Sequence, residues 1–413
     1  MEKLRGSTIL PLISLLALIA GGIFISNYWR TALYYPSNFE ETVQLEAADE
    51  EELIAQEKEE EILTKIKNPS ENGKGVKGLY MNEFVANSRS YLAVNVRNEV
   101  RNLLDDTEIN AVVIDVKEAH GPNLQYSLKT FIDSLRKKGA WVIARICVFR
   151  DGSLIEDKPE WYLKDKNTGE IWRDSGGGYW LDPKVPGVQN YIINFSKLAI
   201  DFGFDELQFD YIRFPSDGDV QGIAYPAFGQ DEKQKYEVIG GFFSTLSHAL
   251  RGYKSDIILS VDLFGYVAVQ HQAFEIGQRT YDAAHAFDYL SFMLYPSHFY
   301  SGFSAGADEK RELPAINLPY ESEDISETVS ANPYQVVSRS IFIAQDYLSQ
   351  IGSEAKIRPW LQDFDIRYDS DRKIYYDAEK VRDQILAAEE AGADGWLLWN
   401  PSGEYTKEAL RKE

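Results

Sequence analysis

Two aspartates lie at corresponding points of two otherwise apolar segments. Asp210 is in the segment Gln208-Phe-Asp-Tyr-Ile-Arg-Phe-Pro, and Asp262 is in the segment Ser260-Val-Asp-Leu-Phe-Gly. Burying a carboxylate among Phe, Val, Ile and Leu costs free energy unless it is paired or lies in a solvated site. Two facing carboxylates can hydrolyse a glycosidic bond, because one protonates the leaving oxygen while the other attacks the sugar or activates water. We therefore predict Asp210 and Asp262 as a catalytic pair.

A structural network of buried ion pairs is the alternative interpretation of these carboxylates. Basic side chains that could neutralise them lie in or near the same kind of segment, namely Lys117, Arg145, Arg213 and Arg358. Side chains two residues apart in a strand point to the same face, so Asp115 is expected to share a face with Lys117. Asp210 and Asp262 are expected at matching depth on adjacent strands, which favours catalysis for this pair.

Polar and aromatic side chains at the ends of the apolar segments are candidates for substrate binding. They are Asn82, Glu83, Asp115, Lys117, Trp180, Tyr211, Arg213, Tyr295, Trp360, Asp363, Trp399 and Asn400. Flat aromatic faces can stack on sugar rings, although each ring alone could equally be core packing. Trp180 lies in a long connection, residues 150–186, that could close over a substrate or be a surface insertion.

Eight apolar segments alternate with amphipathic helical patterns after residue 75. The expected strands cover residues 78–82, 111–117, 140–149, 206–214, 257–265, 289–295, 357–364 and 395–400. Glycines at 139, 203 and 392 are expected to end the preceding helices in the left-handed conformation. This alternation predicts an α/β fold, a (β/α)8 TIM barrel with its site at the carboxyl ends of the strands. An open doubly wound sheet is the alternative, but no glycine-rich nucleotide loop follows the first strand.

Five segments resemble a known bacterial family, the "Putative glycosyl hydrolase domain" family of the TIM-barrel glycosidase superfamily. They begin at Lys77 (KGLYMN), Val113 (VIDVKE), Tyr179 (YWLDP), Gly203 (GFDELQFDYIRFPS) and Ser260 (SVDLFG). The resemblance spans residues 76 to 404 and implies a barrel glycosidase, without indicating a substrate.

In alpha-amylase-like relatives of that family, an Asp on strand four is the nucleophile and a Glu on strand five is the acid. Asp210 matches the first role, and the second position is Asp262 here. Glu83, Glu118 and Asp363 remain alternative candidates for the acid. The resemblance thus supplies a nucleophile and leaves the proton donor open.

Two other function classes compete with an enzyme that uses two carboxylates. The first is a non-catalytic carbohydrate-binding or cell-envelope scaffold protein, which would lack facing carboxylates at hydrolytic spacing. The second is a metal-dependent hydrolase, but the five histidines form no His-x-His or His-Glu-x-x-His pair. We therefore expect no metal and no cofactor, and a monomeric barrel whose partner is a polysaccharide or oligosaccharide substrate.

The charge balance argues against nucleic acid as a partner. The chain has 43 basic and 65 acidic residues and a formal net charge of −22, whereas phosphate binding needs clustered Lys and Arg. Much of that charge lies in residues 40–61, where eleven acids accompany a single lysine, Lys58. Hydrophobic residues make up 44% of the chain, enough for a large core. The only cysteine, Cys147, excludes an internal disulfide.

The N-terminal segment predicts a membrane anchor. Residues 6–29 carry no charge, and Lys3 and Arg5 precede them, which favours a cytoplasmic N-terminus. A cleaved signal peptide is the alternative, although no clear cleavage site follows. We expect an anchor over residues 1–30, an acidic stalk over residues 31–74 and the barrel over residues 75–413. The barrel would then lie outside the cell, membrane-bound, or secreted if the segment is cleaved.

Overall fold

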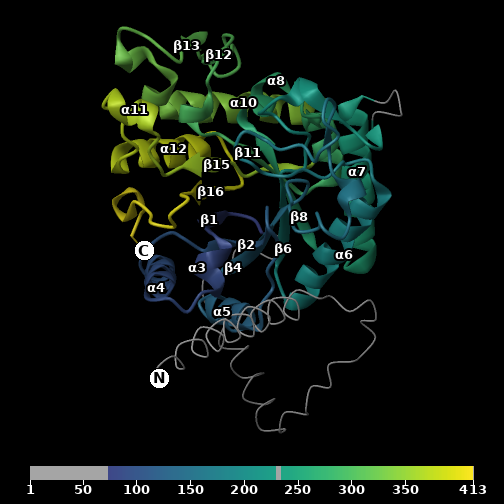
Figure 1. The fold of residues 1–413 in the computed structure, drawn as a ribbon. Coiled ribbons are helices and arrows are strands. Elements are labelled where there is room, and N and C mark those ends of the chain that lie inside the picture. The colour runs from purple at the N-terminus through teal and green to yellow at the C-terminus, as the bar shows by residue number, and fades with distance from the viewer. Residues whose placement is uncertain (1–72, 229–233, 413) are drawn as a thin grey trace, which may run out of the picture. The chain divides into compact units, whose positions relative to one another are not determined.

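Eight parallel strands close into a barrel, as the alternation of apolar segments predicts (Figure 1). The computed structural model describes residues 73–228 and 234–412. Within those residues, the barrel strands are β1 (Val76–Met81), β2 (Ala111–Glu118), β4 (Trp141–Cys147), β6 (Glu206–Asp210), β8 (Ile258–Phe264), β11 (Tyr289–Met293), β15 (Trp360–Gln362) and β16 (Gly395–Trp399). Strand β1 pairs in parallel with both β2 and β16, so the sheet closes on itself. The open doubly wound alternative is therefore wrong.

Helices surround the barrel and connect successive strands (Figure 1). They are α3 (Glu83–Asn87), α4 (Tyr91–Asp106), α5 (Tyr126–Arg136), α6 (Pro186–Phe202), α7 (Lys235–Tyr253), α8 (Gly265–Gln270), α9 (Thr280–Ala286), α10 (Pro333–Gln350), α11 (Arg367–Asp371) and α12 (Ala378–Glu390). After β16, the described residues contain only a short 3-10 helix, η7 (Lys407–Ala409). The predicted glycines Gly139, Gly203 and Gly392 have φ of +76°, +103° and +77°, which confirms how these helices end.

Short additional strands and 3-10 helices lie between the barrel strands in the sequence. The short strands are β3 (Gly121–Pro122), β5 (Lys164–Asp165), β7 (Ile223–Ala224), β9 (Gln272–Ala273), β10 (Gln278–Arg279), β12 (Phe303–Ala305), β13 (Ile316–Leu318) and β14 (Lys356–Ile357). The 3-10 helices are η1 (Pro159–Trp161), η2 (Val220–Gly222), η4 (Pro296–His298), η5 (Ile325–Glu327) and η6 (Val329–Ala331). Strand β14 extends the seventh barrel strand and is separated from β15 by two residues.

Side chains alternate between the barrel interior and the helix layer along each strand. In β2, Val112 and Ile114 pack in the large core cluster between strands and helices, whereas Val113 belongs to a smaller interior cluster that includes Tyr80. The same alternation directs Asp115 into the interior, where it is fully buried. A strand that is apolar on its outer face thus presents a carboxylate inside the barrel.

A buried ion pair fills the barrel at the amino ends of the strands. Glu206, the first residue of β6, accepts hydrogen bonds from Arg358 and Ser260, and both members of the ion pair are 0% exposed. The indole Nε1 of Trp141 donates to Glu206 Oε2 at 2.9 Å. The structural interpretation therefore applies to Arg358, which lies at the opposite end of the barrel from Asp210.

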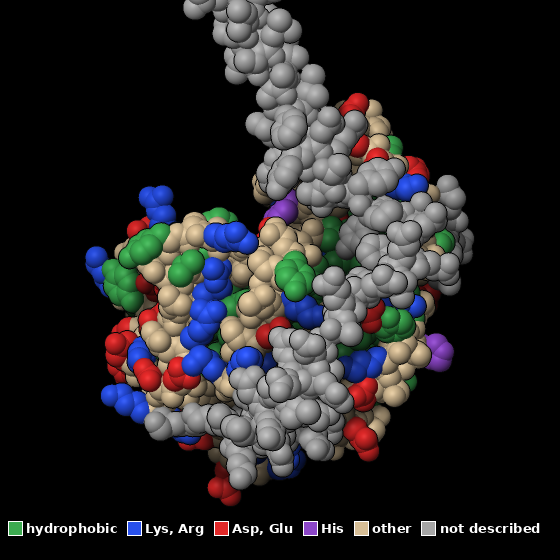
Figure 2. Space-filling model, turned by 90° about the horizontal axis from the view of Figure 1, so that it is seen from below, with side chains coloured by type: hydrophobic (Ala, Val, Ile, Leu, Met, Phe, Trp, Pro, Cys, Tyr) green, Lys and Arg blue, Asp and Glu red, His purple; other side chains and the backbone are tan. Residues whose placement is uncertain are grey.

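Charged side chains on the surface are mixed in sign. Figure 2 shows Lys and Arg side chains interspersed with Asp and Glu on one face of the molecule. Surface ion pairs include Arg136 with Asp205 at 2.6 Å and Lys138 with Asp105 at 2.5 Å. Such solvent-exposed pairs contribute little to stability, so the stability of the barrel rests on its packed interior and helix layer.

The predicted membrane anchor lies outside the described residues, as do the predicted stalk residues up to position 72. Within residues 73–228 and 234–412, none of the helices has both the length and the apolar character needed to cross a membrane. The first barrel strand begins at Val76, one residue after the predicted start of the barrel.

Candidate active site

Arg145, in β4, is the centre of a group of four carboxylates near the carboxyl ends of the strands. Its guanidinium lies 2.5 Å from Asp210 Oδ2, 2.9 Å from Glu118 Oε1 and 3.7 Å from Asp262 Oδ2, and it donates a hydrogen bond to Asp115. The Arg145 side chain is 9% exposed. Burial disfavours its charge, but the surrounding carboxylates outweigh burial and raise its pKa. One cation therefore holds several acids together.

Asp210 is the last residue of β6, and its oxygens accept three hydrogen bonds. Oδ2 accepts from Arg145 Nη2 at 2.5 Å and from Arg145 Nε at 3.2 Å, and Oδ1 accepts from the Tyr211 backbone N–H at 2.6 Å. These three donors fix the orientation of the Asp210 carboxyl group. Tyr211 has φ of +50°, a left-handed conformation that costs a non-glycine residue about 1 kcal/mol. Backbone strain of this kind recurs at functional sites.

Asp262, in the middle of β8, has a different environment. It is 1% exposed, and its Oδ1 accepts a hydrogen bond from the indole Nε1 of Trp360 at 2.8 Å. Among the described residues, its Oδ2 has no hydrogen-bond partner. Burial and the neighbouring Asp210 charge raise the pKa of Asp262 well above its ordinary value, although Arg145 opposes them. Asp262 is thus suited to hold a proton.

The two aspartates lie close enough to act on one bond. Arg145 Nε is 3.2 Å from Asp210 Oδ2 and 3.7 Å from Asp262 Oδ2. The separation of the two carboxylate oxygens is therefore at most the sum of these two distances. Phe209 pairs with Val261, which places the next residue of each strand side by side. Facing carboxylates in glycosidases are about 5–5.5 Å apart in retaining enzymes and about 6.5–9.5 Å apart in inverting ones. The spacing is therefore compatible with hydrolysis.

Asp115 and Glu118 complete the carboxylate group from β2. The fully buried Asp115 accepts hydrogen bonds from Arg145 and from the phenol of Tyr80, and burial raises its pKa well above the ordinary value. The Glu118 side chain is 25% exposed. Burial raises its pKa, but the charge of Arg145 and the hydrogen bonds to Glu118 together lower it below the ordinary value. Tyr80 was missed as a site residue, although its position near the end of β1 could have indicated it.

An aromatic cluster lines the barrel interior beside the carboxylates. The predicted residues Tyr295 and Trp399 stack with ring centroids 5.9 Å apart, and Tyr80 lies 6.4 Å from Trp360. Phe364, which the sequence did not single out, contacts Trp399 at 5.0 Å. The structure thus brings together three predicted aromatic residues, Trp360 from β15, Trp399 from β16 and Tyr295 from the segment that follows β11.

Trp180, Tyr211 and Arg213 form a second cluster. The Arg213 guanidinium lies 5.1 Å from the ring centroids of both Trp180 and Tyr211, and Trp180 donates to Asp174 Oδ2 at 2.9 Å. Arg150 binds the same carboxylate oxygen of Asp174 at 2.7 Å. Trp180 is only 1% exposed, so its indole anchors the long 150–186 connection against β6.

Three predicted polar residues make hydrogen bonds that fix the ends of strands. Asn82 caps α3 by accepting from the Val85 N–H at 2.8 Å. Both oxygens of Asp363 accept from Thr406, at 2.7 Å and 2.9 Å, and Asn400 donates to the Asp363 carbonyl. These contacts hold the C-terminal segment against the barrel. A polar residue at the end of a strand can have this structural role or can bind substrate, and the sequence alone does not distinguish the two.

Lys117 and Glu83 lie beside the carboxylate group and do not join it. The register between β2 and β4 shifts between Asp115 and Lys117, and the buried Lys117 Nζ pairs with Asp151 Oδ2 at 2.8 Å. Lys117 therefore neutralises Asp151, contrary to the simple alternation that joined it to Asp115. Glu83 contacts the exposed His120, and its Oε2 has no partner among the described residues.

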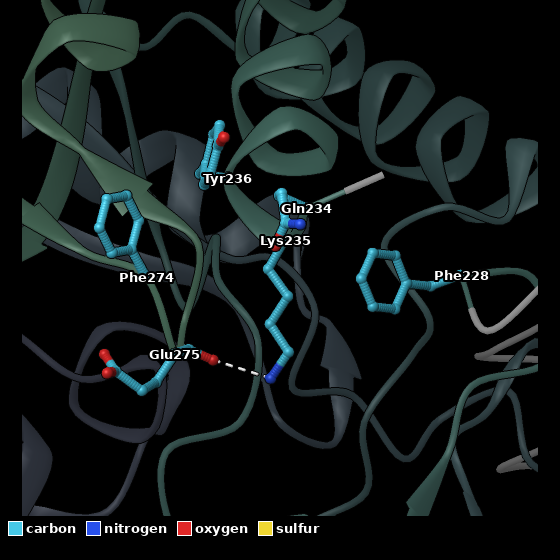
Figure 3. A pocket seen from close by; sticks show the side chains of 6 residues that line it. All are labelled: Phe228, Gln234, Lys235, Tyr236, Phe274 and Glu275. Carbon is cyan, nitrogen blue, oxygen red and sulfur yellow. Dashed lines mark hydrogen bonds between the residues drawn. The ribbon is translucent and has the colours of Figure 1, made fainter. Parts of the chain in front are cut away.

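A surface cavity of about 660 Å³ lies apart from these residues (Figure 3). Its lining residues are Phe228, Gln234, Lys235, Tyr236, Phe274 and Glu275. Figure 3 shows Lys235 reaching across it to donate to the Glu275 carbonyl, at 2.8 Å. None of the predicted site residues lines this cavity. In residues 73–228 and 234–412, no three His, Cys, Asp or Glu side chains are arranged to hold a metal ion.

Comparison with solved structures shows the same fold in glycoside hydrolases. The glycoside hydrolase domain of PgaB (BpsB) from Bordetella bronchiseptica is 16% identical over 82% of this chain and 99% of that domain, with a TM-score of 0.52. The beta-galactosidase of Marinomonas ef1 is 12% identical over 81% of this chain and 58% of that enzyme, with a TM-score of 0.55. A hypothetical protein from Ruminiclostridium thermocellum is 30% identical over 45% of this chain and 96% of its own, with a TM-score of 0.37.

The family comparison covers most of the barrel. No curated protein matches this sequence. A family model matches residues 122–405, from β3 to the segment that follows β16, and thus includes Arg145, Asp210 and Asp262. By this match the chain belongs to the family described as "Putative glycosyl hydrolase domain".

Proposed function

We propose that this protein hydrolyses glycosidic bonds in extracellular or cell-envelope polysaccharide, with Asp210 as nucleophile and Asp262 as general acid. The observation that carries the proposal is that Asp210 and Asp262 both lie near Arg145 Nε but have different surroundings. Asp210 accepts three hydrogen bonds, whereas Asp262 Oδ2 accepts none among the described residues. Two acids with opposed protonation states are what a glycosidase needs, since one must attack while the other donates a proton.

The reaction follows from the positions of these groups. Asp210 attacks the anomeric carbon and forms a glycosyl ester, while Asp262 transfers its proton to the leaving oxygen. Asp262, now a carboxylate, then deprotonates the water that hydrolyses the ester and regains its proton. The upper bound on the separation between Asp210 Oδ2 and Asp262 Oδ2 is shorter than most of the carboxyl separations of about 6.5–9.5 Å found in inverting enzymes. We therefore propose retention of the anomeric configuration.

Polysaccharide as the substrate class rests on the aromatic cluster beside the acids. Trp399, which is only partly buried, offers a ring surface and is stacked on the buried Tyr295. Both rings belong to the same cluster as Trp360, the indole partner of Asp262. Sugar rings bind such surfaces through their apolar C–H faces. The sugar and its linkage are to be identified by screening the full-length protein against a panel of soluble polysaccharides.

The role of Asp262 as general acid is tested with two substrates whose leaving groups differ in their need for protonation. In Asp262→Ala, kcat/KM on a cleaved polysaccharide should fall by about 10²- to 10⁴-fold, the usual contribution of a general acid. On a dinitrophenyl glycoside, whose leaving group needs no proton, the first step should be nearly unaffected. Asp256→Ala, at an exposed position six residues earlier, is the matched control.

The pH dependence gives a second readout from the same variant. Because the pKa of Asp262 is raised, wild-type kcat/KM should stay high above the ordinary Asp range and fall as pH rises through the raised pKa. The residual activity of Asp262→Ala on the polysaccharide should lack this alkaline limb, and the dinitrophenyl glycoside should show no such limb in either protein. If Glu118→Gln showed that pattern and Asp262→Ala did not, Glu118 would be the acid. If no panel polysaccharide were cleaved and several were bound, the carbohydrate-binding scaffold would be the function.

We propose that residues 6–29 hold the protein at the cell membrane with the barrel outside. The support is the uncharged apolar segment preceded by Lys3 and Arg5. After alkaline carbonate extraction, the protein should remain with the membrane, begin at its original N-terminus and be cut by protease added to intact cells. A mature N-terminus between residues 25 and 40 would contradict the anchor and indicate secretion.

A further inference from the structure

A continuous line of aromatic rings leads outward from the carboxylates. It begins at Trp399 and Tyr295 in the interior cluster and continues to His298, whose ring centroid is 5.4 Å from that of Tyr295. His298 stacks in turn on Tyr300, at 5.7 Å and an interplanar angle of 24°. Tyr300 is 61% exposed. The line therefore connects the candidate active site to an aromatic ring that is open to solvent.

The exposed Tyr300 ring is held in place by neighbours from other segments. Tyr320 meets it edge to face at 5.5 Å, and Tyr320 stacks on Tyr368 at 4.9 Å with an interplanar angle of 7°. Arg372 lies 4.1 Å from the Tyr368 ring centroid and donates to the Tyr320 carbonyl at 3.0 Å. An exposed ring fixed in this way loses little conformational entropy when a ligand stacks on it.

We propose that Tyr300 is the stacking platform of a sugar subsite beyond the catalytic aspartates, so that the substrate is a glycan chain bound across several sugar units. This inference rests on the proposed function, because the line of rings starts at the residues assigned to catalysis. The glycan chain is favoured as occupant because ring contacts connect the exposed Tyr300 to that site through His298 and Tyr295. Packing of the β11–α10 connection would be a sufficient reason for the contact between Tyr320 and Tyr368. It leaves most of the Tyr300 side chain exposed to solvent.

The test compares Tyr300→Ala and Tyr300→Trp with a matched control in the full-length protein. The control is Tyr375→Ala, since Tyr375 is 45% exposed and has no ring contact within the described part of the chain. Binding is measured by retardation in native gels that contain starch, galactomannan or chitosan, in an Asp210→Asn background that removes turnover. Turnover is measured with the polysaccharide that the wild type cleaves best and with the aryl glycoside of its repeating sugar.

In the polysaccharide gel that retards the parent most, Tyr300→Ala should weaken binding about tenfold, which corresponds to a loss of about 1.4 kcal/mol, and Tyr300→Trp should restore it. The ratio of kcat/KM on polymer to kcat/KM on aryl glycoside should fall by a similar factor. Equal retardation of Tyr300→Ala and Tyr375→Ala, or no retardation of the parent by any gel, would overturn the subsite. Retardation that depends on Tyr300 without hydrolysis by the wild type would support the subsite and contradict the proposed enzyme.

Discussion

Asp210→Asn should reduce hydrolysis of any cleaved polysaccharide by at least about 10⁴-fold, because an amide cannot form the glycosyl ester. The substitution keeps the shape of the side chain and leaves an oxygen that can accept the 2.6 Å hydrogen bond from the Tyr211 N–H. Arg145 retains Asp115 and Glu118 as partners, so the barrel should still fold. The initial rate and the circular dichroism spectrum of the purified variant check both expectations.

Chemical rescue sharpens this result. In Asp210→Gly, azide can occupy the vacated space and attack the anomeric carbon, while Asp262 protonates the leaving oxygen. The product should be a glycosyl azide whose anomeric configuration is opposite to that of the substrate, as expected for a retaining enzyme that has lost its nucleophile. Asp217→Asn, an exposed position seven residues later, is the control and should keep wild-type activity. Full activity in Asp210→Asn would remove Asp210 from the mechanism.

Arg145→Met should destabilise the protein by about 3–5 kcal/mol at neutral pH, the usual cost of removing one partner of a buried ion pair. Methionine fills similar volume but leaves Asp115, Asp210 and Asp262 without their common cation in the barrel interior. Activity should be lost as well, since Arg145 binds the proposed nucleophile at 2.5 Å. Denaturant unfolding of the wild type and the variant measures the difference in free energy.

The destabilisation should shrink at acidic pH. Burial raises the pKa of Asp115 and Asp262 in the folded protein, so the stability they contribute is present below the ordinary Asp pKa and declines as pH rises through the raised values. Arg145 opposes both shifts, and its removal therefore raises both pKa values further and extends the decline to higher pH, which makes the total loss of stability larger. Arg145 also lowers the pKa of Glu118, a stabilisation that is lost as pH falls through the lowered value. Each of these three effects makes the loss of stability in Arg145→Met larger at neutral pH than at acidic pH.

A surface arginine provides the matched control. Arg136 pairs with Asp205 at 2.6 Å, but its side chain is 40% exposed, so Arg136→Met should cost less than about 1 kcal/mol. Unfolding of both variants should be compared at pH 4.5 and at pH 7.5. An equal loss of stability for Arg145→Met at the two pH values would contradict the charge argument and point to packing alone.

Local sequence patterns were sufficient to predict eight parallel strands covered by helices. Apolar segments bounded by helix-ending glycines such as Gly203 and Gly392 specify strands buried on both faces, and burial on both faces requires a parallel sheet covered by helices. What the patterns could not decide was whether the sheet closes. Closure depends on the pairing of β1 with β16, a contact between segments more than 300 residues apart.

The candidate site was only partly predictable for the same reason. Asp210 and Asp262 could be found because a carboxylate inside an apolar strand is costly, and that cost is visible in a single segment. The roles of Lys117 and Asp363 were not visible there, because their partners Asp151 and Thr406 come from other connections. Trp180 matches an aromatic platform by composition, yet the folded 150–186 connection encloses it.

The sequence by itself therefore determined the number and order of the strands, their carboxyl-end chemistry and the two aspartates. Only the tertiary structure decided that Arg145 approaches both aspartates and that Asp262 lacks a full set of partners while Asp210 has three. The physical reason is that alternation along a strand fixes the face of a side chain. The electrostatic environment of that side chain depends instead on groups that converge from β2, β4, β6, β8 and β15 only when the barrel closes.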